Sequence, residues 1–306
     1  MPKVVFLLAP DVHLLDLAGP AQVFFSAGEF GHPYEIHYVA ETDSVRSAQG
    51  LVLRAEPDWP ALTAADLVVV PGWQSPLRTP GPLRPQTLAR LTDHHTRGGT
   101  VASICGGADA LGRAGLLDGR RCTTHHEVQE QLARRYPRAQ VVRDVLYVVD
   151  GRVVTSAGIA SGIDLALHLV AVRHGPAEAA RVARAMVVYV RRNGDEQQAS
   201  ALLRHRGHVV EAVHRAQDLI DARFTDRLAL GELAAAVGVS ERTLTRRFTA
   251  ATGLTPLRYQ QELRLERAEH LLAGGTTGEA AARAVGFQDA RMLRRLRARE
   301  AAAAVG

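Results

Sequence analysis

The sequence predicts a doubly wound α/β domain with a parallel sheet, followed by an all-α domain. Over residues 1–175 short apolar runs alternate with helical patterns, as they do where parallel strands are joined by helices. Beyond about residue 208 the apolar spacing is helical, and no segment has the pattern of a strand. A chain of 306 residues also suits two domains of about 150 residues each.

The bounds of the apolar runs give the elements of the first domain. Each run is short and is flanked by Gly, Pro or polar residues, so buried strands are expected over 4–8, 34–40, 66–70, 100–104 and 152–155. Helices are expected over 20–30, 84–96, 108–114, 127–136, 158–173 and 176–190. Residues 191–207 are polar without an apolar period, which predicts a linker between domains at 1–190 and 208–306.

The excess positive charge lies entirely in the last third of the chain. Residues 1–190 hold 18 basic (Lys and Arg) and 18 acidic residues, whereas 191–306 hold 19 and 14, out of 37 and 32 in all. A neutral first domain and a basic second one favour an anionic partner for the second. A solvated arginine-rich surface accounts for the charge equally well, so the motifs have to decide between the two.

Composition and spacing argue against several classes of protein. No stretch approaches the ~20 apolar residues of a membrane span, so no membrane partner is expected. The N-terminal apolar run is interrupted by Asp11 and Asp16 and predicts a first strand, not a secretory signal. Two cysteines do not make a disulfide framework, which favours a reducing cytoplasm.

Neither a metal nor a cofactor is expected. The adjacent pairs His94–His95 and His125–His126 point apart on a helix or a strand, and no cysteine or carboxylate stands at ligand spacing from them. The Gly98–Gly99 pair is too short to form a phosphate loop.

The clearest local pattern is LALGELAAAVGVSERTLTRRFTAATGLTP at 228–256. Gly238 can end one helix in a left-handed conformation, and Ser240 can cap the next helix. The turn between them is only a few residues long, which is the helix-turn-helix arrangement. The first helix carries an apolar stripe at Leu230, Leu233, Ala234 and Val237.

The second helix of this pattern is a candidate for recognition of double-stranded DNA. Leu244 and Phe248 stand four residues apart and are expected to face inward, which leaves an outer face rich in arginine. Arginine can donate two hydrogen bonds to guanine O6 and N7 in the major groove. The candidate DNA-contacting residues are Arg242, Thr243, Thr245 and Arg246.

Residues 208–287 as a whole resemble the DNA-binding domain of the AraC/XylS regulators. ATGLTPLRYQQELRLERAEHLL is similar to that family's long linker helix, on which Leu263, Ala268 and Leu271–Leu272 would pack against both subdomains. GEAAARAVGFQDA resembles the start of its second helix-turn-helix. The resemblance implies two recognition helices about one duplex turn apart. It also implies outward positions on the second of them at Arg291, Arg294 and Arg295.

The match departs from the family after Phe287. Arg297 stands where the family has a large apolar residue, and AREAAAAVG replaces its closing segment. Either the second unit is shortened and poorly packed, or its last helix shifts register so that Leu293 and Leu296 supply the core. A helical oligomerisation or docking domain is the alternative to DNA binding.

A second cluster, VASICGGADALGRAGLLDGRRCTTHH, lies in the first domain. A strand is expected to end at Ile104, Cys105 follows, and Gly106–Gly107 permit a sharp turn into a helix, as in a nucleophile elbow. At a helix N-terminus the dipole favours the thiolate form of Cys105. Cys122 is expected to be a packed small side chain.

Together with LLDLAGPAQVF, VVVPGW and TSAGIASGIDLALHLV, this cluster resembles the ThiJ/PfpI group of class-I glutamine-amidotransferase-like domains. The resemblance covers about 1–190, implies a flavodoxin-like fold, and extends to members fused to an AraC-type domain, the GlxA-like regulators. It implies a nucleophile position at Cys105 with Asp16 as the acid beside it. Gly106 replaces the histidine of the peptidases and the threonine of many relatives, and His126 replaces a tryptophan.

The interpretation that follows is a cytoplasmic, sequence-specific transcriptional regulator, nucleoid-associated when bound to DNA. We expect a homodimer controlled by a small, amino-acid-like or nitrogenous effector. The alternative is a cysteine-dependent hydrolase or hydratase, similar to isonitrile hydratases, with Cys105, Asp16 and His125 as catalytic residues and a vestigial DNA-binding tail. The effector site is expected at Asp16, Cys105, Gly106, His125, Ser156 and Ser161.

Overall fold

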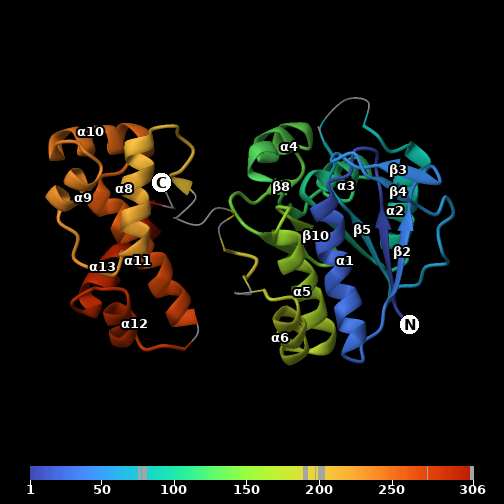
Figure 1. The fold of residues 1–306 in the computed structure, drawn as a ribbon. Coiled ribbons are helices and arrows are strands. Elements are labelled where there is room, and N and C mark those ends of the chain that lie inside the picture. The colour runs from blue at the N-terminus through green and yellow to red at the C-terminus, as the bar shows by residue number, and fades with distance from the viewer. Residues whose placement is uncertain are drawn as a thin grey trace. The chain divides into compact units, whose positions relative to one another are not determined.

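The computed structural model describes residues 1–74, 77, 81–188, 192–196, 198, 204–273 and 275–303. The chain divides into two compact units, Met1–Gln198 and Ala199–Gly306 (Figure 1). None of the described helices is long and apolar enough to cross a membrane.

The first unit is built on a six-stranded, mostly parallel sheet in the order β2-β1-β5-β6-β10-β9. Its parallel strands are β1 (Lys3–Leu7), β2 (Glu35–Val39), β5 (Leu67–Val70), β6 (Thr100–Ile104) and β10 (Val153–Ser156). They match the five predicted strands to within two residues at each end. The edge strand β9 (Tyr147–Asp150) pairs antiparallel with β10 and was not predicted. Two small ribbons, β3 (Ser44–Arg46) with β4 (Val52–Arg54) and β7 (Arg121–Cys122) with β8 (Gln140–Val141), complete the strands.

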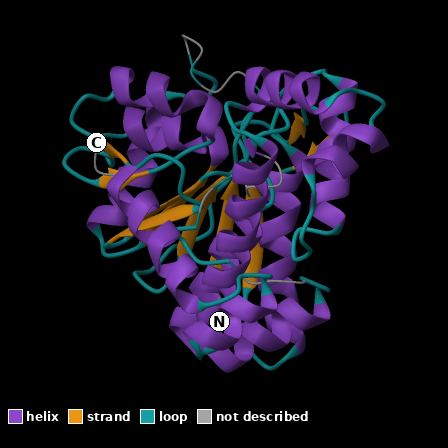
Figure 2. Cartoon of the chain, turned by 90° about the vertical axis from the view of Figure 1, so that its left-hand side faces the viewer, coloured by secondary structure: helices purple, strands orange, loops and turns teal. Residues whose placement is uncertain are grey.

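Helices cover both faces of this sheet, which confirms the doubly wound class (Figures 1 and 2). Val4 and Phe6 of β1 belong to one core, and the alternate residues Val5 and Leu7 belong to the other. One core is shared with α1 (Leu14–Glu29), α5 (Ser161–His174) and α6 (Pro176–Ala185). The opposite core is shared with α2 (Pro85–Thr96), α3 (Ala108–Arg113) and α4 (Gln129–Arg135).

The first helix begins six residues earlier than the predicted start at residue 20. Proline favours the first turn of a helix, so the sequence placed the start at Pro20, but that residue lies inside α1. The helix instead follows the extended residue His13, whose N–H donates to the Gly72 carbonyl at 2.9 Å. The earlier start puts Asp16 in the first turn, at the carboxyl end of the sheet.

The ends of the other predicted helices also change. Helix α5 begins at Ser161 rather than at 158, because Gly158 (φ +93°) and Ile159 (φ +50°) form a left-handed turn before it. Helix α6 ends at Ala185, and residues 189–191 of the predicted helix and linker lie outside the described residues.

The second unit consists of helices in its described part. In order they are α8 (Glu211–Ala222), α9 (Leu230–Ala236), α10 (Glu241–Thr252), α11 (Pro256–Ala273), α12 (Gly278–Ala284) and α13 (Ala290–Ala303). One core contains Leu244, Phe248 and Tyr259, and a second contains Leu265 and Leu293. Helix α11 contributes to both cores, as expected for a linker helix.

The predicted linker at 191–207 is described only in part, because residues 191, 197 and 199–203 lie outside the described residues. Its first portion packs on the first unit. The Leu146 N–H donates to the Gly194 carbonyl at 2.9 Å, and the Gln198 N–H donates to Asp144 Oδ1 at 3.1 Å.

Candidate functional site

The turn after β6 holds Cys105 in a strained conformation. Cys105 has φ +52°, a region that residues with a Cβ rarely adopt, and it begins a short 3-10 helix, Cys105–Gly107. The Thr124 hydroxyl donates to the Cys105 carbonyl at 2.7 Å and secures the turn. Glycines enclose it, because a Cβ at Gly72 would lie 2.8 Å from the Cys105 Cβ and one at Gly158 would overlap it. The predicted elbow is therefore present.

Asp16 lies beside this turn and is completely buried. Its Oδ1 accepts a hydrogen bond from the Ile159 N–H at 2.5 Å. Its Oδ2 has no hydrogen-bond partner of good geometry in the described part of the chain, and a Cβ at Gly72 would lie 2.5 Å from it. Burial raises the pKa of the carboxyl, and the Ile159 N–H, the charge of His13 and the nearby Cys105 thiol oppose the rise. Asp16 is thus a buried acid whose second oxygen lies beside the Cys105 turn.

The Cys105 thiol is held as the neutral acid. Burial, followed by the charge of Asp16, raises its pKa to about 12, although the Gly106 N–H acts in the opposite direction. The expectation that the helix dipole would favour the thiolate is therefore wrong. The turn is too short and too enclosed for the dipole to outweigh the loss of solvent and the neighbouring carboxylate.

The two predicted serines hold the loop that contacts Asp16. Ser156 Oγ accepts from the Gly158 N–H at 3.2 Å, and the Ser161 hydroxyl donates to the Gly158 carbonyl at 2.9 Å. Both side chains are buried. Their hydroxyls fix the backbone that presents the Ile159 N–H, so their contribution to a site is chiefly the shape of this loop.

A cavity of about 160 Å³ lies against the same loop. His125 and Ser161 are the predicted site residues in its wall, and Cys105 packs against Gly158, which is also part of the wall. Burial, then the neighbouring His126, lowers the pKa of His125. The two imidazole rings are tilted by 35° relative to each other, with centroids 4.2 Å apart. Within the described residues no hydrogen bond joins His125 to Cys105, so the three proposed catalytic residues do not form a connected relay.

Two residues of the cavity wall come from the predicted linker and were missed by the sequence analysis. Arg192 donates to Asp164 Oδ2 from Nη2 at 2.5 Å and from Nε at 3.1 Å. Gln198 donates to the carbonyls of Thr124 and Val145, each at 3.0 Å. A polar segment without periodicity carries no signal for such contacts, because the partners are distant in sequence.

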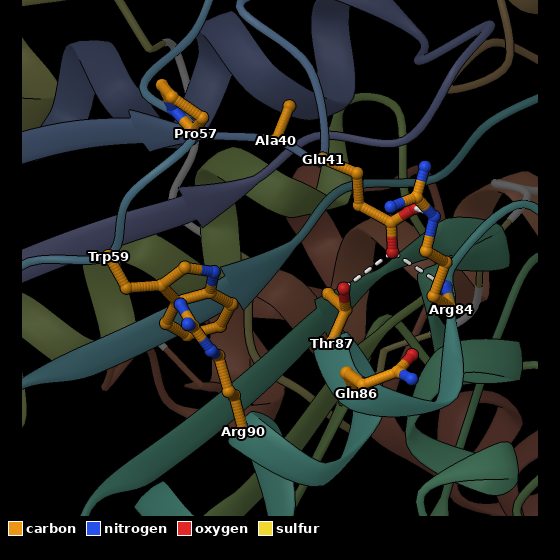
Figure 3. Close-up of a pocket in the computed structure, with 8 residues that line it drawn as sticks. All are labelled: Ala40, Glu41, Pro57, Trp59, Arg84, Gln86, Thr87 and Arg90. Carbon is orange, nitrogen blue, oxygen red and sulfur yellow. Dashed lines mark hydrogen bonds and ion pairs between the residues drawn. The ribbon is translucent and has the colours of Figure 1, made fainter.

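A larger cavity, of about 300 Å³, shares none of these wall residues (Figure 3). Its charged groups are already paired. Glu41 accepts from the Thr87 hydroxyl at 2.5 Å and from the Arg84 N–H at 2.6 Å, and Arg90 lies over the ring of Trp59 at 5.8 Å. The smaller cavity adjoins the elbow and contains two of the predicted site residues, His125 and Ser161, so it is the better candidate for a ligand site.

The first helix-turn-helix of the second unit is formed as predicted. Gly238 adopts φ +73° after α9, and Ser240 caps α10 by accepting from the Thr243 N–H at 3.3 Å. Leu244 and Phe248 are completely buried. Of the predicted DNA-contacting residues, Arg242 and Arg246 are exposed and Thr243 and Thr245 are half-exposed.

The second helix-turn-helix resolves the alternatives left open after Phe287. Leu293 and Leu296 are each 2% exposed, so the register in which they supply the core is the one observed. Arg297 lies at the surface and pairs with Glu269 at 2.6 Å. The predicted outward residues Arg291, Arg294 and Arg295 are exposed.

Residues 2–172 match the DJ-1/PfpI family, and residues 233–304 match a helix-turn-helix domain. The chain belongs to the DJ-1/PfpI family. This confirms the ThiJ/PfpI resemblance, and the second match confirms the AraC-type helix-turn-helix domain.

Similar proteins combine or separate the two domains. The chain is 30% identical over 273 residues to the HTH-type transcriptional regulator CdhR of Pseudomonas aeruginosa, which covers 87% of this chain and 79% of CdhR. It is 35% identical over 173 residues to the isonitrile hydratase of Pseudomonas putida, which covers 55% of this chain and 70% of the hydratase. A crystal structure of an AraC family transcriptional regulator from Pseudomonas putida superimposes with a TM-score of 0.52 at 26% identity and covers 61% of this chain and all of that one.

Proposed function

We propose that the chain is a ligand-responsive transcriptional regulator, with the DNA-binding site in the second unit and the effector site in the first. The capped recognition helix α10 carries this conclusion, because it presents Arg242 and Arg246 to solvent over a buried Leu244 and Phe248. Similarity to a transcriptional regulator over 87% of the chain supports the same function for both domains together.

The effector site is the cavity beside the elbow. Its volume of about 160 Å³ corresponds to about five water molecules, so the effector is a small metabolite. Arg192 and the His125–His126 pair supply hydrogen-bond donors to its wall, and Gln198 adds a side-chain amide. These groups suit an amino-acid-like or nitrogenous compound.

Arg192 and Gln198 offer a route from this cavity to the DNA-binding domain. Both residues line the cavity, and both lie in the segment that continues into the second unit. An effector that contacts them competes with the Asp164 ion pair or the Thr124 hydrogen bond. Regulation requires that the effector bind two arrangements of the protein, with Arg192 and Gln198 bonded as described or released, with different affinity. In a homodimer, this difference would shift the placement of two DNA-binding domains.

The same site supports sensing better than turnover. The raised pKa of Cys105 leaves little thiolate near pH 7, and His125 makes no hydrogen bond to the thiol within the described residues. A cysteine-dependent hydrolase or hydratase is the second candidate. It is favoured by the Asp16–Cys105 pair and by 35% identity to an isonitrile hydratase.

Binding of the full chain to the gene's upstream DNA, measured across a salt series, tests the function directly. Binding that survives competitor DNA, weakens with salt and is absent from a 1–198 fragment is the expected result. Binding no tighter than to unrelated DNA would contradict it.

A Cys105→Ser variant separates the two candidates. Effector-dependent change in DNA affinity should largely survive in this variant if the domain is a sensor. An assay of the wild-type chain with alkyl isonitriles is the companion measurement. Turnover that disappears in Cys105→Ser would establish the enzyme instead.

A further inference from the structure

The two helix-turn-helix units of the second domain have separate cores. Tyr259 and Leu263 of α11 belong to the first core, and Leu265 and Ala268 of the same helix belong to the second. Phe224, in the loop after α8, packs against both. The angle between the two recognition helices is therefore affected by α11 and by the contacts between this loop and the second helix-turn-helix.

Arg264, half-buried on α11, bonds to both sides of that junction. On the side of the first helix-turn-helix, its Nε donates to the Phe224 carbonyl at 2.6 Å, and its Nη2 donates to the carbonyls of Thr225 and Asp226 at 3.1 and 2.7 Å. On the side of the second helix-turn-helix, its Nη1 donates to the Gly286 carbonyl at 2.9 Å. The rigid, planar guanidinium is suited to fix several acceptors at once.

The turn of the second helix-turn-helix approaches the loop after α8 so closely that only glycine fits in the turn. Gly286 has φ +82°, and a Cβ there would overlap the Thr225 carbonyl oxygen. The Arg264 guanidinium also lies 5.6 Å from the ring of Phe287. The backbone contact at Gly286 and the Arg264 guanidinium thus join the loop after α8 to the turn of the second helix-turn-helix.

We propose that Arg264 is a positioning residue that sets the spacing between the two DNA segments read by α10 and α13. The proposal rests on the DNA-binding function above. Its hydrogen bonds hold the loop before the first helix-turn-helix against the turn inside the second. Without them, the two recognition helices can adjust to DNA in which their contact segments are shifted.

Gln260 provides a matched control. It lies one helical turn before Arg264, and its Nε2 donates to the Phe224 and Asp226 carbonyls at 2.9 and 2.8 Å. It therefore bonds the same loop, but within the described residues it makes no hydrogen bond to Gly286. Gln260→Ala should reduce the stability of the domain without releasing the second helix-turn-helix from the loop after α8.

The test uses the full-length chain and DNA enriched by the wild-type protein from a random-sequence library. Footprinting locates the two contacted segments, and one base pair is then inserted or deleted between them, which rotates one segment by about 34° relative to the other. Wild type and Gln260→Ala should lose at least about tenfold in affinity on each change. Arg264→Ala should bind the unaltered DNA more weakly but lose less than about threefold on the same change.

Arg264→Lys separates positioning from charge and remains informative if the alanine variant does not fold. Lysine retains the positive charge but carries its donors on one nitrogen, so it cannot span all four carbonyls. It should relax the spacing preference and keep the salt dependence of binding. Equal spacing penalties in wild type, Arg264→Lys and Gln260→Ala would overturn the proposal, as would a wild type indifferent to spacing. A wild type that enriches no DNA would instead overturn the DNA-binding function on which the proposal rests.

Discussion

The two functional regions place their polar groups in opposite surroundings. Beside Cys105 the polar atoms are buried and mostly bonded to the protein itself, as Asp16 is to the Ile159 N–H. On α10 the arginines at 242 and 246 stand in solvent, supported by buried apolar residues underneath. In the first region the chemistry depends on backbone packing, whereas in the second it depends on side chains that can be changed without disturbing the fold. The predictions below test this difference.

The largest expected effect is on the reactivity of Cys105. With a pKa raised to about 12, chiefly by burial, the thiolate becomes populated only as the pH rises toward that value. An unperturbed cysteine has a pKa of about 8.5. At pH 8 we expect Cys105 to react with iodoacetamide at least about 100-fold more slowly than in the unfolded chain. Its rate should then rise about tenfold for each pH unit up to pH 11. Peptide-resolved mass spectrometry measures this rate.

Cys122 serves as the internal control for this measurement. It is also buried, and burial raises its pKa to about 11. Rapid modification of both cysteines would report unfolding. Rapid modification at pH 8 confined to Cys105 would contradict the prediction, would show that the thiol is ionised, and would favour the hydrolase or hydratase.

Gly158→Ala should destabilise the first unit more than any single change at an exposed arginine. The new methyl group would overlap Cys105, and alanine would also be strained at φ +93°. Loss of about 3 kcal/mol or more in the free energy of unfolding is expected, from overpacking together with backbone strain. Chemical denaturation measures it.

Gly175→Ala isolates the strain from the overlap. Gly175 has a similar φ of +97°, but nothing lies within 4 Å of the position of its Cβ. We expect a loss of about 1–3 kcal/mol there, from backbone strain alone. Equal losses for the two variants would show that the packing of Gly158 against Cys105 adds nothing.

Arg246→Ala should weaken specific DNA binding by about 1–3 kcal/mol without changing the unfolding of the protein. Arg247, the next residue on α10, is also exposed and is the control for lost charge. Arg247→Ala should lower affinity for specific and unrelated DNA alike. Titrations of both variants against specific and unrelated duplexes make the comparison. If Arg246→Ala also weakened the two equally, a base contact by Arg246 would be excluded.

The sequence predicted the second region better than the first, for a physical reason. The helix-turn-helix depends on local signals, such as the left-handed turn at Gly238 and the cap at Ser240, which act within a few residues. The five parallel strands and the elbow were likewise predictable from local patterns. The surroundings of Cys105 were not, because they arise from contacts across the chain. Asp16 meets the N–H of Ile159, which is 143 residues away in sequence.

The smallest expected effect is at Arg297, and it sharpens the comparison within the second unit. The AraC/XylS resemblance predicts an apolar core residue at this position, yet the Arg297 side chain is 51% exposed and its ion pair with Glu269 is at the surface. Surface ion pairs contribute little, so Arg297→Ala should cost less than about 1 kcal/mol of stability. Leu296→Ala, one residue earlier, should cost about 2–5 kcal/mol because its side chain is 2% exposed in the second core. Thermal unfolding of the two variants decides between the registers of α13. A larger loss at Arg297 than at Leu296 would mean that the helix packs in the register that the AraC/XylS resemblance implies.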